Sequence, residues 1–378
     1  MRIAVLGAGA MGAAAARLLT RHDEVDLVVL DADPGRTERA LSEIGRGESR
    51  PVGAGVEGLI AAIAGADAVA SCVPYRLNLD VMEAALTARV PYADLGGLFH
   101  MTLRQLELDD RFQEAGVPAI LGIGCCPGTS NLLARLGSLR LDTVRSIDIL
   151  DGATEEISGF GVPYSADTIL DEFTAPAMVF QGGALQEVPA ASGAIRYLFP
   201  DPVGEMEAVY TLHSEPATLP QTIDGVRDVR WRLALPPKVA EGFRMLVGLG
   251  LAGQEPVETA SCSVAPRDLL KALLARIPGP EGPAADVEAL VVRAEGTVEG
   301  RDAVFTGTVM LYPTPEGIGG GAFGTAIPMA VASRWLAEGR VPAGCHPPET
   351  ALPAEEFLDD LVREGVRLTV SVEESPSA

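Results

Sequence analysis

RIAVLGAGAMG, residues 2–12, is the stretch of the chain that decides the fold. A short aliphatic run ending at Leu6 leads into a GxGxxG loop, and an alanine-rich stretch follows at residues 13–19. In such a loop the first glycine permits the tight turn, the second lets the backbone approach a pyrophosphate, and the third lets helix and strand pack closely. The pyrophosphate then lies at the positive end of the helix. The stretch predicts a dinucleotide site whose cofactor-binding residues are Gly7, Gly9, Ala10, Met11 and Gly12.

The next apolar run indicates which dinucleotide binds. It covers residues 25–30 and ends in Asp31, about 20 residues after the glycine loop, where a carboxylate accepts hydrogen bonds from the adenosine ribose. The same carboxylate repels the additional phosphate of NADP. Arg36 offers the opposite interpretation, because an arginine here can meet a 2′-phosphate. Asp31 and Asp33 together favour NAD as the cofactor.

Up to about residue 121 the chain alternates expected strands with expected helices. Further strands are expected at residues 66–73, 90–95 and 117–121, with helices at residues 77–87 and 103–114 between them. This alternation is typical of α/β proteins and predicts a Rossmann fold with a doubly wound parallel sheet. Ligands bind beyond the carboxyl ends of such strands. The cofactor contacts therefore also include Val73, Pro74 and Gly96.

From about residue 146 the pattern changes to consecutive strands with few helices, which continue to residue 311. This predicts a second, α+β domain with a mixed sheet. The length of 378 residues agrees with two domains, because single cores stop growing at roughly 250–300 residues. We expect a dinucleotide-binding Rossmann domain at residues 1–123 and a substrate domain at residues 124–325. In residues 326–378 we expect a helix at 326–339 that returns to the Rossmann domain, followed by a C-terminal tail.

Composition argues against several classes of protein and site. A net charge of −23 repels phosphate backbones, so we expect no nucleic-acid partner. We find neither an apolar run of about 18 residues nor a signal-peptide pattern, and therefore expect a cytoplasmic protein with no membrane contact. The five scattered cysteines match no disulfide framework, and no CxxC pair or His pair at i, i+4 is present. We therefore expect no metal site.

Several segments beyond the glycine loop resemble one family. They are VPY at residues 73–75, DLGG at 94–97, GCCPG at 124–128, SADTILDEFTAPA at 165–177 and PPE at 347–349. In this order they resemble the saccharopine dehydrogenase-like oxidoreductases, and within that family the lysine 6-dehydrogenases. The resemblance implies NAD(P) on the Rossmann domain and an amino-acid substrate between the domains. It also implies that the second domain supports dimerisation, so we expect a homodimer or a higher homo-oligomer.

One position departs from the saccharopine-forming members of this family. They usually carry an acidic residue immediately before the Pro-Gly pair, where this chain has Cys126. Lysine 6-dehydrogenases have a small uncharged residue there, which Cys126 approximates. The resemblance therefore places Cys126 at the substrate and favours lysine over saccharopine.

Oxidation of an amine by hydride transfer requires a neutral amine, so a base must first take its proton. His100 follows a strand end and titrates in the useful range, although an ordinary loop histidine is the alternative. Asp94 would orient a substrate ammonium or cap a turn. Tyr75 would approach the nicotinamide or pack on the cofactor as a lid. The expected catalytic residues are thus His100, Asp94 and Tyr75.

Three further charged groups are candidates for holding the ends of a substrate. Asp171, with the neighbouring Glu172, would hold a cationic end, or would belong to a solvated helix face. Arg196 would clamp a substrate carboxylate from a mobile loop, and His213 is a second candidate of that kind.

The sequence leaves three functions open. The first is oxidation of an amino group by NAD, of the lysine 6-dehydrogenase type. The second is an opine-type reductive amination, saccharopine- or carboxyspermidine-like, which joins an amino acid to a carbonyl compound. The third is an NAD(H)-responsive binding protein without turnover.

Overall fold

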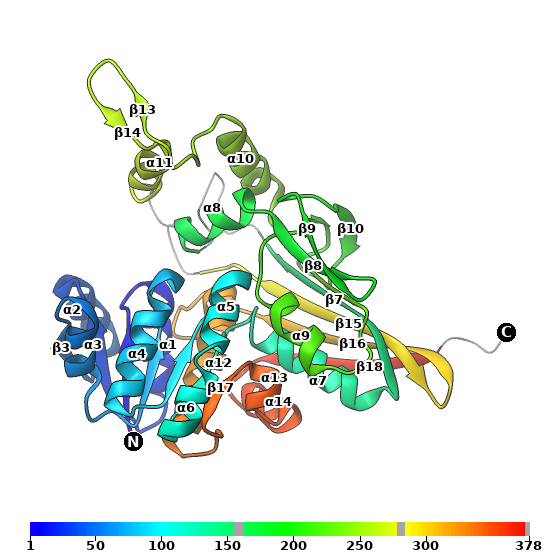
Figure 1. The fold of residues 1–378 in the computed structure, drawn as a ribbon, viewed down its shortest axis with the longest axis horizontal. Helices are drawn as coiled ribbons and strands as arrows, with labels where there is room; N and C mark the ends of the chain where they lie inside the picture. The colour runs from blue at the N-terminus through cyan, green and yellow to red at the C-terminus, as the bar shows by residue number, and fades with distance from the viewer. Residues whose placement is uncertain (155–161, 163, 278–283, 375–378) are drawn as a thin grey trace.

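The computed structural model describes residues 1–154, 162, 164–277 and 284–374. Within these residues two seven-stranded sheets dominate the structure, one for each domain (Figure 1). The first sheet is parallel and the second is mixed, so the predicted fold class is confirmed.

The first sheet has the strand order β17-β6-β5-β4-β1-β2-β3. Because β1 lies between β2 and β4, the direction of winding reverses beside β1, and ligands bind at such a point outside the carboxyl ends. The strands are β1 (Arg2–Leu6), β2 (Asp26–Asp31), β3 (Glu48–Pro51), β4 (Ala68–Ser71), β5 (Tyr92–Asp94), β6 (Pro118–Ile120) and β17 (Gly344–His346).

Helices alternate with these strands along the first part of the chain, as the pattern predicts. They are α1 (Ala10–Leu19), α2 (Pro34–Ile44), α3 (Gly55–Ile63), the short 3-10 helix η1 (Tyr75–Leu77), α4 (Asn78–Ala88), α5 (Leu98–Leu106) and α6 (Asp109–Ala115).

Strand β17 is an addition that the sequence pattern does not predict. It pairs in parallel with β6, with Cys345 opposite Ala119, and so extends the first sheet with residues from near the C-terminus. Three residues are too short to show a strand periodicity, which explains why the sequence interpretation missed it.

The second sheet has the order β18-β16-β15-β7-β12-β8-β9. Strands β7 and β12 are parallel, and the other neighbours are antiparallel. The strands are β7 (Thr143–Ala153), β8 (Ala177–Gln181), β9 (Ala184–Val188), β12 (Asp228–Ala234), β15 (Glu288–Val298), β16 (Arg301–Leu311) and β18 (Arg367–Glu374).

Helices and two small hairpins surround the second sheet. The helices are α7 (Thr129–Arg140), α8 (Ala166–Thr174), α9 (Glu215–Thr222), α10 (Pro237–Gly248), α11 (Pro266–Leu274), α13 (Pro348–Ala351) and α14 (Ala354–Arg363). The hairpins are β10 (Ile195–Leu198) with β11 (Glu205–Ala208), and β13 (Val257–Glu258) with β14 (Ser263–Val264). In Figure 1 the second hairpin projects from the body of the molecule next to α11.

Helix α12 (Gly320–Ala337) packs against α1 and against strands β1, β4 and β5 of the first sheet. It begins six residues earlier than the expected helix at 326–339, inside a glycine-rich stretch. A Cβ on Gly324 would overlap the side chain of Leu311, so glycine lets the helix lie this close to β16. Its side chains are buried on nearly all sides, as expected for a helix between two layers. The tail that follows is described only as far as residue 374.

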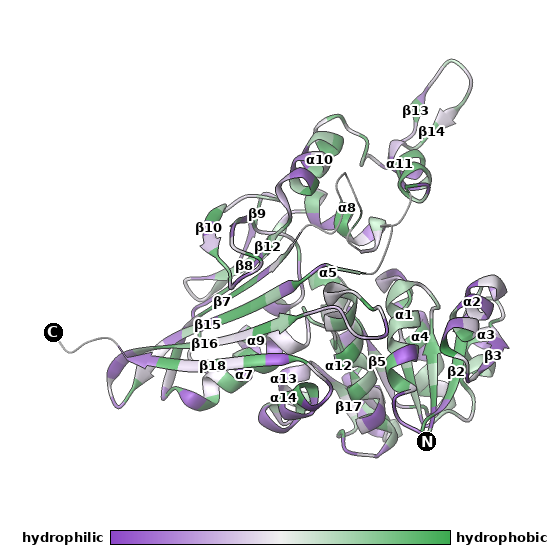
Figure 2. Ribbon diagram, turned by 180° about the vertical axis from the view of Figure 1, so that it is seen from behind, coloured by the Kyte–Doolittle hydropathy of each residue, from purple (hydrophilic) through white to green (hydrophobic). Residues whose placement is uncertain are grey.

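Apolar residues are concentrated inside both layers. Figure 2 shows the apolar colouring on the strands of the first sheet and the hydrophilic colouring on outer helices such as α14. Among the described residues, no helix combines the length and apolar character that crossing a membrane requires.

Alanine substitutions at two glycines of the first loop should affect stability and cofactor binding differently. A Cβ on Gly12 would overlap the carbonyl oxygen of Gly7, whereas a Cβ on Gly9 would meet nothing within 4 Å. Gly12→Ala should therefore destabilise the cofactor-free protein by about 1–3 kcal/mol through overpacking. Gly9→Ala should leave its melting temperature unchanged and weaken NADH binding. Thermal unfolding and NADH fluorescence titration measure the two effects, and equal melting temperatures for both variants would contradict the prediction.

Candidate active site

The glycine loop has the geometry of a pyrophosphate cradle. Gly7 adopts a φ of +98°, and a Cβ there would lie 2.8 Å from the carbonyl oxygen of Cys72. Among the described residues no side chain caps the N-terminus of α1, so the first-turn amides of Ala10 and Met11 remain available to a ligand. Gly9 faces open space at this point. The loop therefore fits a dinucleotide, which these backbone groups would hold when it is bound.

Asp31 lies at the end of β2, as expected, and its carboxylate is bound by backbone amides. Oδ2 accepts a hydrogen bond from the Ala8 amide at 2.8 Å, and Oδ1 accepts one from the Asp33 amide at 2.9 Å. A hollow of about 410 Å³ lies beside the loop and is lined by Gly9, Ala10 and the α2 side chains of Arg36 and Arg39. The adenosine end of a dinucleotide fits in this place.

Val73 and Pro74 follow β4, and Gly96 follows β5, so all three lie at the carboxyl edge of the first sheet. Gly96 has a φ of +115°, and its carbonyl accepts a hydrogen bond from the Asn78 side chain at 3.3 Å. Their assignment to the cofactor remains a proposal.

Of the two roles that the sequence left open for Asp94, the structure agrees with the one at a turn. It is only 1% exposed, and Oδ2 accepts hydrogen bonds from the Tyr92 hydroxyl at 2.8 Å and from the Gln105 amide at 2.5 Å. Oδ1 accepts from the backbone amides of Gly96 at 2.7 Å and Gly122 at 2.9 Å. Burial raises the pKa of Asp94, and these donors act in the opposite direction. With four donors on two oxygens, the side chain fastens β5 to its neighbours and is not free to orient an ammonium.

His100 and Arg196 both occupy exposed positions. His100 is exposed on α5, and its ring meets the edge of the Phe99 ring with centroids 5.2 Å apart. The Arg196 side chain is 81% exposed on β10 and pairs with Glu205 on the adjacent strand. The structure therefore gives neither residue the enclosed position expected of a base or a carboxylate clamp.

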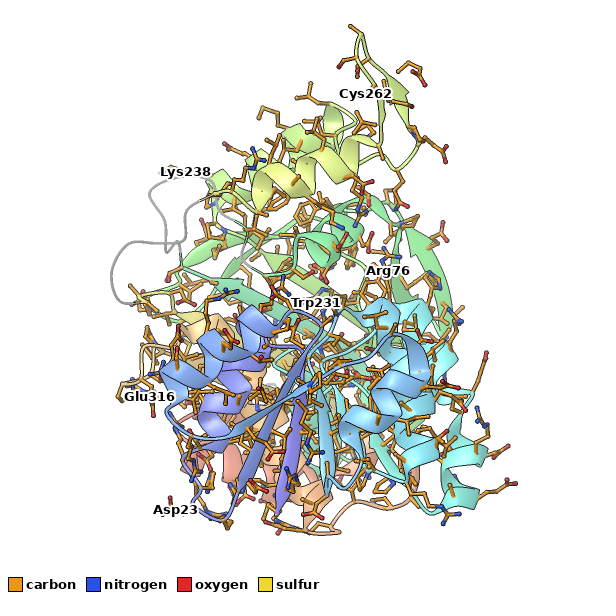
Figure 3. The ribbon with its side chains drawn as sticks, turned by 90° about the vertical axis from the view of Figure 1, so that its left-hand side faces the viewer. Asp23, Arg76, Trp231, Lys238, Cys262 and Glu316 are labelled. Carbon is orange, nitrogen blue, oxygen red and sulfur yellow. The ribbon has the colours of Figure 1, made fainter. Side chains whose placement is uncertain are left out.

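Tyr75 and Asp171 are brought together, but they hold the two domains to each other. The Tyr75 hydroxyl donates to Asp171 Oδ2 at 2.7 Å, and Arg76 reaches the same oxygen at 2.5 Å. Arg267 pairs with Asp171 Oδ1 at 2.8 Å. Burial and the Asp171 carboxylate raise the pKa of Tyr75, so the phenol keeps its proton. Asp171 is thus neutralised by two arginines, and Figure 3 shows Arg76 where the two domains meet.

A group of acids lies near this junction, two of them buried (Glu172 and Glu215) and two half-buried (Asp151 and Glu288). Asp151 lies near the end of β7, Glu172 is on α8, Glu215 begins α9 and Glu288 begins β15. The register places Asp151 opposite Leu290, two residues along β15 from Glu288. We call Asp151, Glu172, Glu215 and Glu288 the acid cluster.

His213 belongs to the acid cluster through a short hydrogen bond between Nδ1 and Glu215 Oε2. Its ring stacks on Trp231, with centroids 4.0 Å apart and planes 18° apart, and Figure 3 shows Trp231 near the domain junction. Ser130 donates to the other oxygen of Glu215 at 2.7 Å. Tyr164 donates to Glu172 Oε2 at 2.6 Å. Asp151 Oδ1 is buried and has no hydrogen-bond partner among the described residues.

The pKa values show that the positive charge of His213 does not balance the carboxylates of the acid cluster. Burial, and then the negative charges of Glu288, Glu215 and Glu172, raise the pKa of Asp151 well above its usual range. Burial raises the pKa of Glu172 to about 7, against the opposing effect of His213, and that of Glu288 to about 7. Burial disfavours the charged imidazole of His213, yet Glu215 and Glu172 raise its pKa overall. Such a site is suited to receive a cation and to exchange protons near neutral pH.

Cys126, which the resemblance places at the substrate, lies beside Asp151 of the acid cluster. Cys125, Cys126 and Asp151 each offer a potential metal ligand atom, and these atoms lie within 4.8 Å of one another. The two sulfur atoms are 3.9 Å apart and are not bonded. Burial and the surrounding carboxylates raise the pKa of the Cys126 thiol, so it remains protonated and neutral.

The sequence interpretation missed most of the acid cluster. Asp151, Glu215 and Glu288 were not candidates, and Glu172 and His213 were only alternatives. The available signal was an acidic residue at the end of an apolar strand, as in Asp151 and Glu288. The register that brings these two strands together cannot be read from such a pattern.

Comparison with known proteins assigns the family. Residues 3–120 match the saccharopine dehydrogenase NADP binding domain, and residues 124–366 match the saccharopine dehydrogenase C-terminal domain. The chain belongs to the saccharopine dehydrogenase family. It is therefore an NAD(P)-linked oxidoreductase, which confirms the resemblance at the level of the family.

The chain is also similar to individual proteins of known name over most of its length. Carboxynorspermidine synthase of Vibrio cholerae is 26% identical over 302 residues, which cover 72% of each chain. Carboxyaminopropylagmatine dehydrogenase of Synechocystis is 22% identical over 288 residues, again 72% of each chain. The solved structure of saccharopine dehydrogenase (L-Glu forming) from Saccharomyces cerevisiae superposes with a TM-score of 0.75 at 16% identity. That match covers 98% of this chain and 99% of the yeast chain, and it shows the shared fold.

The role of Asp94 can be tested by stability. Asp94→Ala leaves four buried donors without their acceptor, so the free energy of unfolding should fall by about 3–5 kcal/mol. Asp110→Ala, an exposed position on α6, is the control and should change it by less than about 0.5 kcal/mol. Urea unfolding measures both. A variant with wild-type stability but no turnover would return Asp94 to the catalytic residues.

Glu172 should make stability depend on pH. In the folded protein the Glu172 carboxyl has a pKa of about 7, above the ordinary 4.5. The stability that protonated Glu172 contributes is therefore complete below pH 4.5 and is lost as the pH rises to about 7. Glu172→Gln keeps a neutral side chain, so its stability should fall less over this range, by roughly 2–3 kcal/mol. Urea unfolding at a series of pH values measures this, with the exposed Glu114→Gln as control. Parallel profiles for Glu172→Gln and the wild type would refute the assignment.

Proposed function

We propose that this chain catalyses an opine-type reductive amination in which a primary amine with a further positive charge is joined to a carbonyl compound. The observation that carries the proposal is the acid cluster, four carboxyl groups that separate elements bring together beside His213, with Glu172, Glu215 and His213 buried and Asp151 and Glu288 half-buried. Burial without compensating cations is costly, and a polyamine-like substrate supplies them.

Two parts of the acid cluster have different surroundings. Glu172 and Glu215 contact hydroxyl donors, and Glu215 also holds His213. Asp151 and Glu288 lie on adjacent strands beside the two thiols, and Asp151 keeps one oxygen unpaired. An amine that reacts near His213 would therefore place its second charge near Asp151 and Glu288.

Proton transfer is the task of the protein in such a reaction. Amine and carbonyl first form a carbinolamine, which loses water to give an imine, and hydride with a proton then gives the secondary amine. The bound reduced nicotinamide supplies the hydride. His213, oriented by Glu215 and stacked on Trp231, takes the proton from the substrate ammonium and returns one when water leaves.

The comparisons favour this reaction over the lysine 6-dehydrogenase type that the sequence placed first. The two relatives, carboxynorspermidine synthase and carboxyaminopropylagmatine dehydrogenase, are named for carboxylated polyamines. Cys126 supports the lysine alternative, because it is the small uncharged residue expected of lysine 6-dehydrogenases.

A substrate panel separates the possibilities. NADH and NADPH oxidation would be followed with 1,3-diaminopropane, putrescine, agmatine or lysine, each with and without a 2-oxo acid or an amino-acid semialdehyde. We expect oxidation that requires both a diamine or agmatine and the carbonyl partner. NADH formation from lysine and NAD alone would establish the lysine alternative. Nucleotide binding with no turnover on any pair would support a binding protein.

The two candidate histidines can be compared directly. His213→Asn should lower kcat by about 10²–10⁴-fold and leave NADH affinity nearly unchanged, because it removes proton transfer and not cofactor contacts. His100→Asn, on the exposed face of α5, should retain most of the rate. Steady-state kinetics with the substrates found above provide the measurement. The opposite pattern would restore His100 as the base and remove His213.

A further inference from the structure

We propose that Glu349 is a positioning residue for the pair formed by His213 and Glu215. It acts through two side chains of α7, those of Asn131 and Ser130. The inference rests on the proposed function, in which His213 transfers protons. Glu349 ends the PPE segment, which resembles the family but has no part in the site described above. It follows β17 of the first sheet, yet its side chain contacts α7 and α9 beside the second sheet.

The Glu349 carboxylate is buried and is bound by neutral donors. The residue is 3% exposed. Oε2 accepts a hydrogen bond from Asn131 Nδ2 at 2.9 Å, and Oε1 accepts one from the Thr222 hydroxyl at 3.0 Å. In the part of the chain that the structure describes, no cation contributes to its surroundings. Burying a carboxylate without a counter-charge is costly, so packing alone does not account for it. What the carboxylate provides is a strong acceptor for the Asn131 amide.

Both ends of the Asn131 side chain are therefore fixed. Nδ2 donates to Glu349, and Oδ1 accepts a hydrogen bond from the backbone amide of Gly128 at 3.1 Å. A flipped amide would place its NH2 group against the Gly128 N–H and its oxygen against the carboxylate, so these partners select one orientation. In this orientation Asn131 closes the first turn of α7, which carries Ser130. Glu349 thereby holds this turn in place.

Ser130 connects the turn to the proposed base. It is fully buried, and its hydroxyl donates to Glu215 Oε1 at 2.7 Å, whereas Asn131 Oδ1 is farther away at 3.3 Å. The other oxygen of Glu215 contacts Nδ1 of His213. When Glu215 is ionised, this contact requires the proton on Nδ1 and leaves Nε2 to take the substrate proton. If Ser130 were displaced, Glu215 could rotate, and His213 would lose its preference for this tautomer.

The tautomer of His213 tests the proposal without turnover. Glu349→Ala removes the acceptor of Asn131, whereas Glu349→Gln keeps an oxygen for Asn131 and an amide that can donate to Thr222. Heteronuclear NMR of the full chain with isotope-labelled histidine distinguishes the ring nitrogens, and His213→Asn identifies the His213 signals. Above the raised pKa of His213, the wild type and Glu349→Gln should show the Nδ1–H form. Glu349→Ala and Ser130→Ala should show a mixture with the Nε2–H form.

Steady-state kinetics with an active substrate pair give the second readout. Glu349→Ala and Ser130→Ala should lower kcat roughly 10–100-fold and leave both KM values within about twofold, because a misplaced base affects proton transfer and not binding. Glu349→Gln should retain most of the rate. Glu355→Ala is the matched control. The Glu355 side chain is 67% exposed on α14 and pairs with Arg140, so this variant should behave like the wild type in both measurements.

Ser130→Ala breaks the last contact without disturbing α13, so it tests the proposal even where Glu349→Ala does not fold. An Nδ1–H form that persists in Ser130→Ala would overturn the proposal. Equal effects of Glu349→Ala and Glu349→Gln would also overturn it, since Glu349 would then act through its charge and not through Asn131. If the tautomer changes as expected but His213→Asn keeps the wild-type rate, the positioning role stands and the proposed function loses its base.

Discussion

The rest of the structure depends on the packing of α12 between the two sheets. Its body lies on α1 and on strands β4 and β5, the elements that form the dinucleotide site. At its N-terminus the Gly321 amide donates to Asp286 at 2.8 Å, and a Cβ there would lie 2.8 Å from Glu288 Oε2. Thr325 contacts the turn at Gly124. One buried helix therefore fixes the distance between the nucleotide loop, the thiol-bearing turn and the acid cluster.

This packing explains how so many acidic groups can be held in one place. Each carboxylate disfavours the negative charge of its neighbours. Some of the carboxyl groups therefore keep their protons, as the raised pKa values of Glu172 and Glu288 show. The cost of burial is offset by the apolar surface that α12, α7 and the second sheet remove from water in one continuous core. A cation that enters is thus attracted both by the remaining negative charge and by the groups that ionise in its presence.

The sequence predicts the dinucleotide-binding domain well because the pattern that identifies this domain is short-range. The tight turn, the close helix and the strand end at Asp31 occur within about 30 residues, and each step follows from backbone geometry. Strand β17 was not predicted because three residues are too few to show a periodicity. The start of α12 was not predicted because its glycines are also typical of a loop. The sequence left the role of Asp94 open between a substrate contact and a turn, for a different reason. Its position at a strand end is correct for an active site, but its four donors come from Tyr92, Gln105 and the turns after β5 and β6, which only the fold brings together.

The proposed substrate site differs in this respect. Asp151, Glu172, Glu215 and Glu288 lie on four elements, and no pair of them shares a local motif. Each carboxylate is a side chain on its own strand or helix and can change without altering the backbone of that element, whereas a change at Gly12 would disturb the packing of α1 on the loop. Cys126 illustrates this freedom, since a thiol occupies the position before the cis Pro127 within a turn that is otherwise closed by the Gly124 and Gly128 backbone. In the proposed function, side chains on a constant backbone would set the choice of substrate. The dinucleotide loop depends on the backbone conformation itself and tolerates fewer changes.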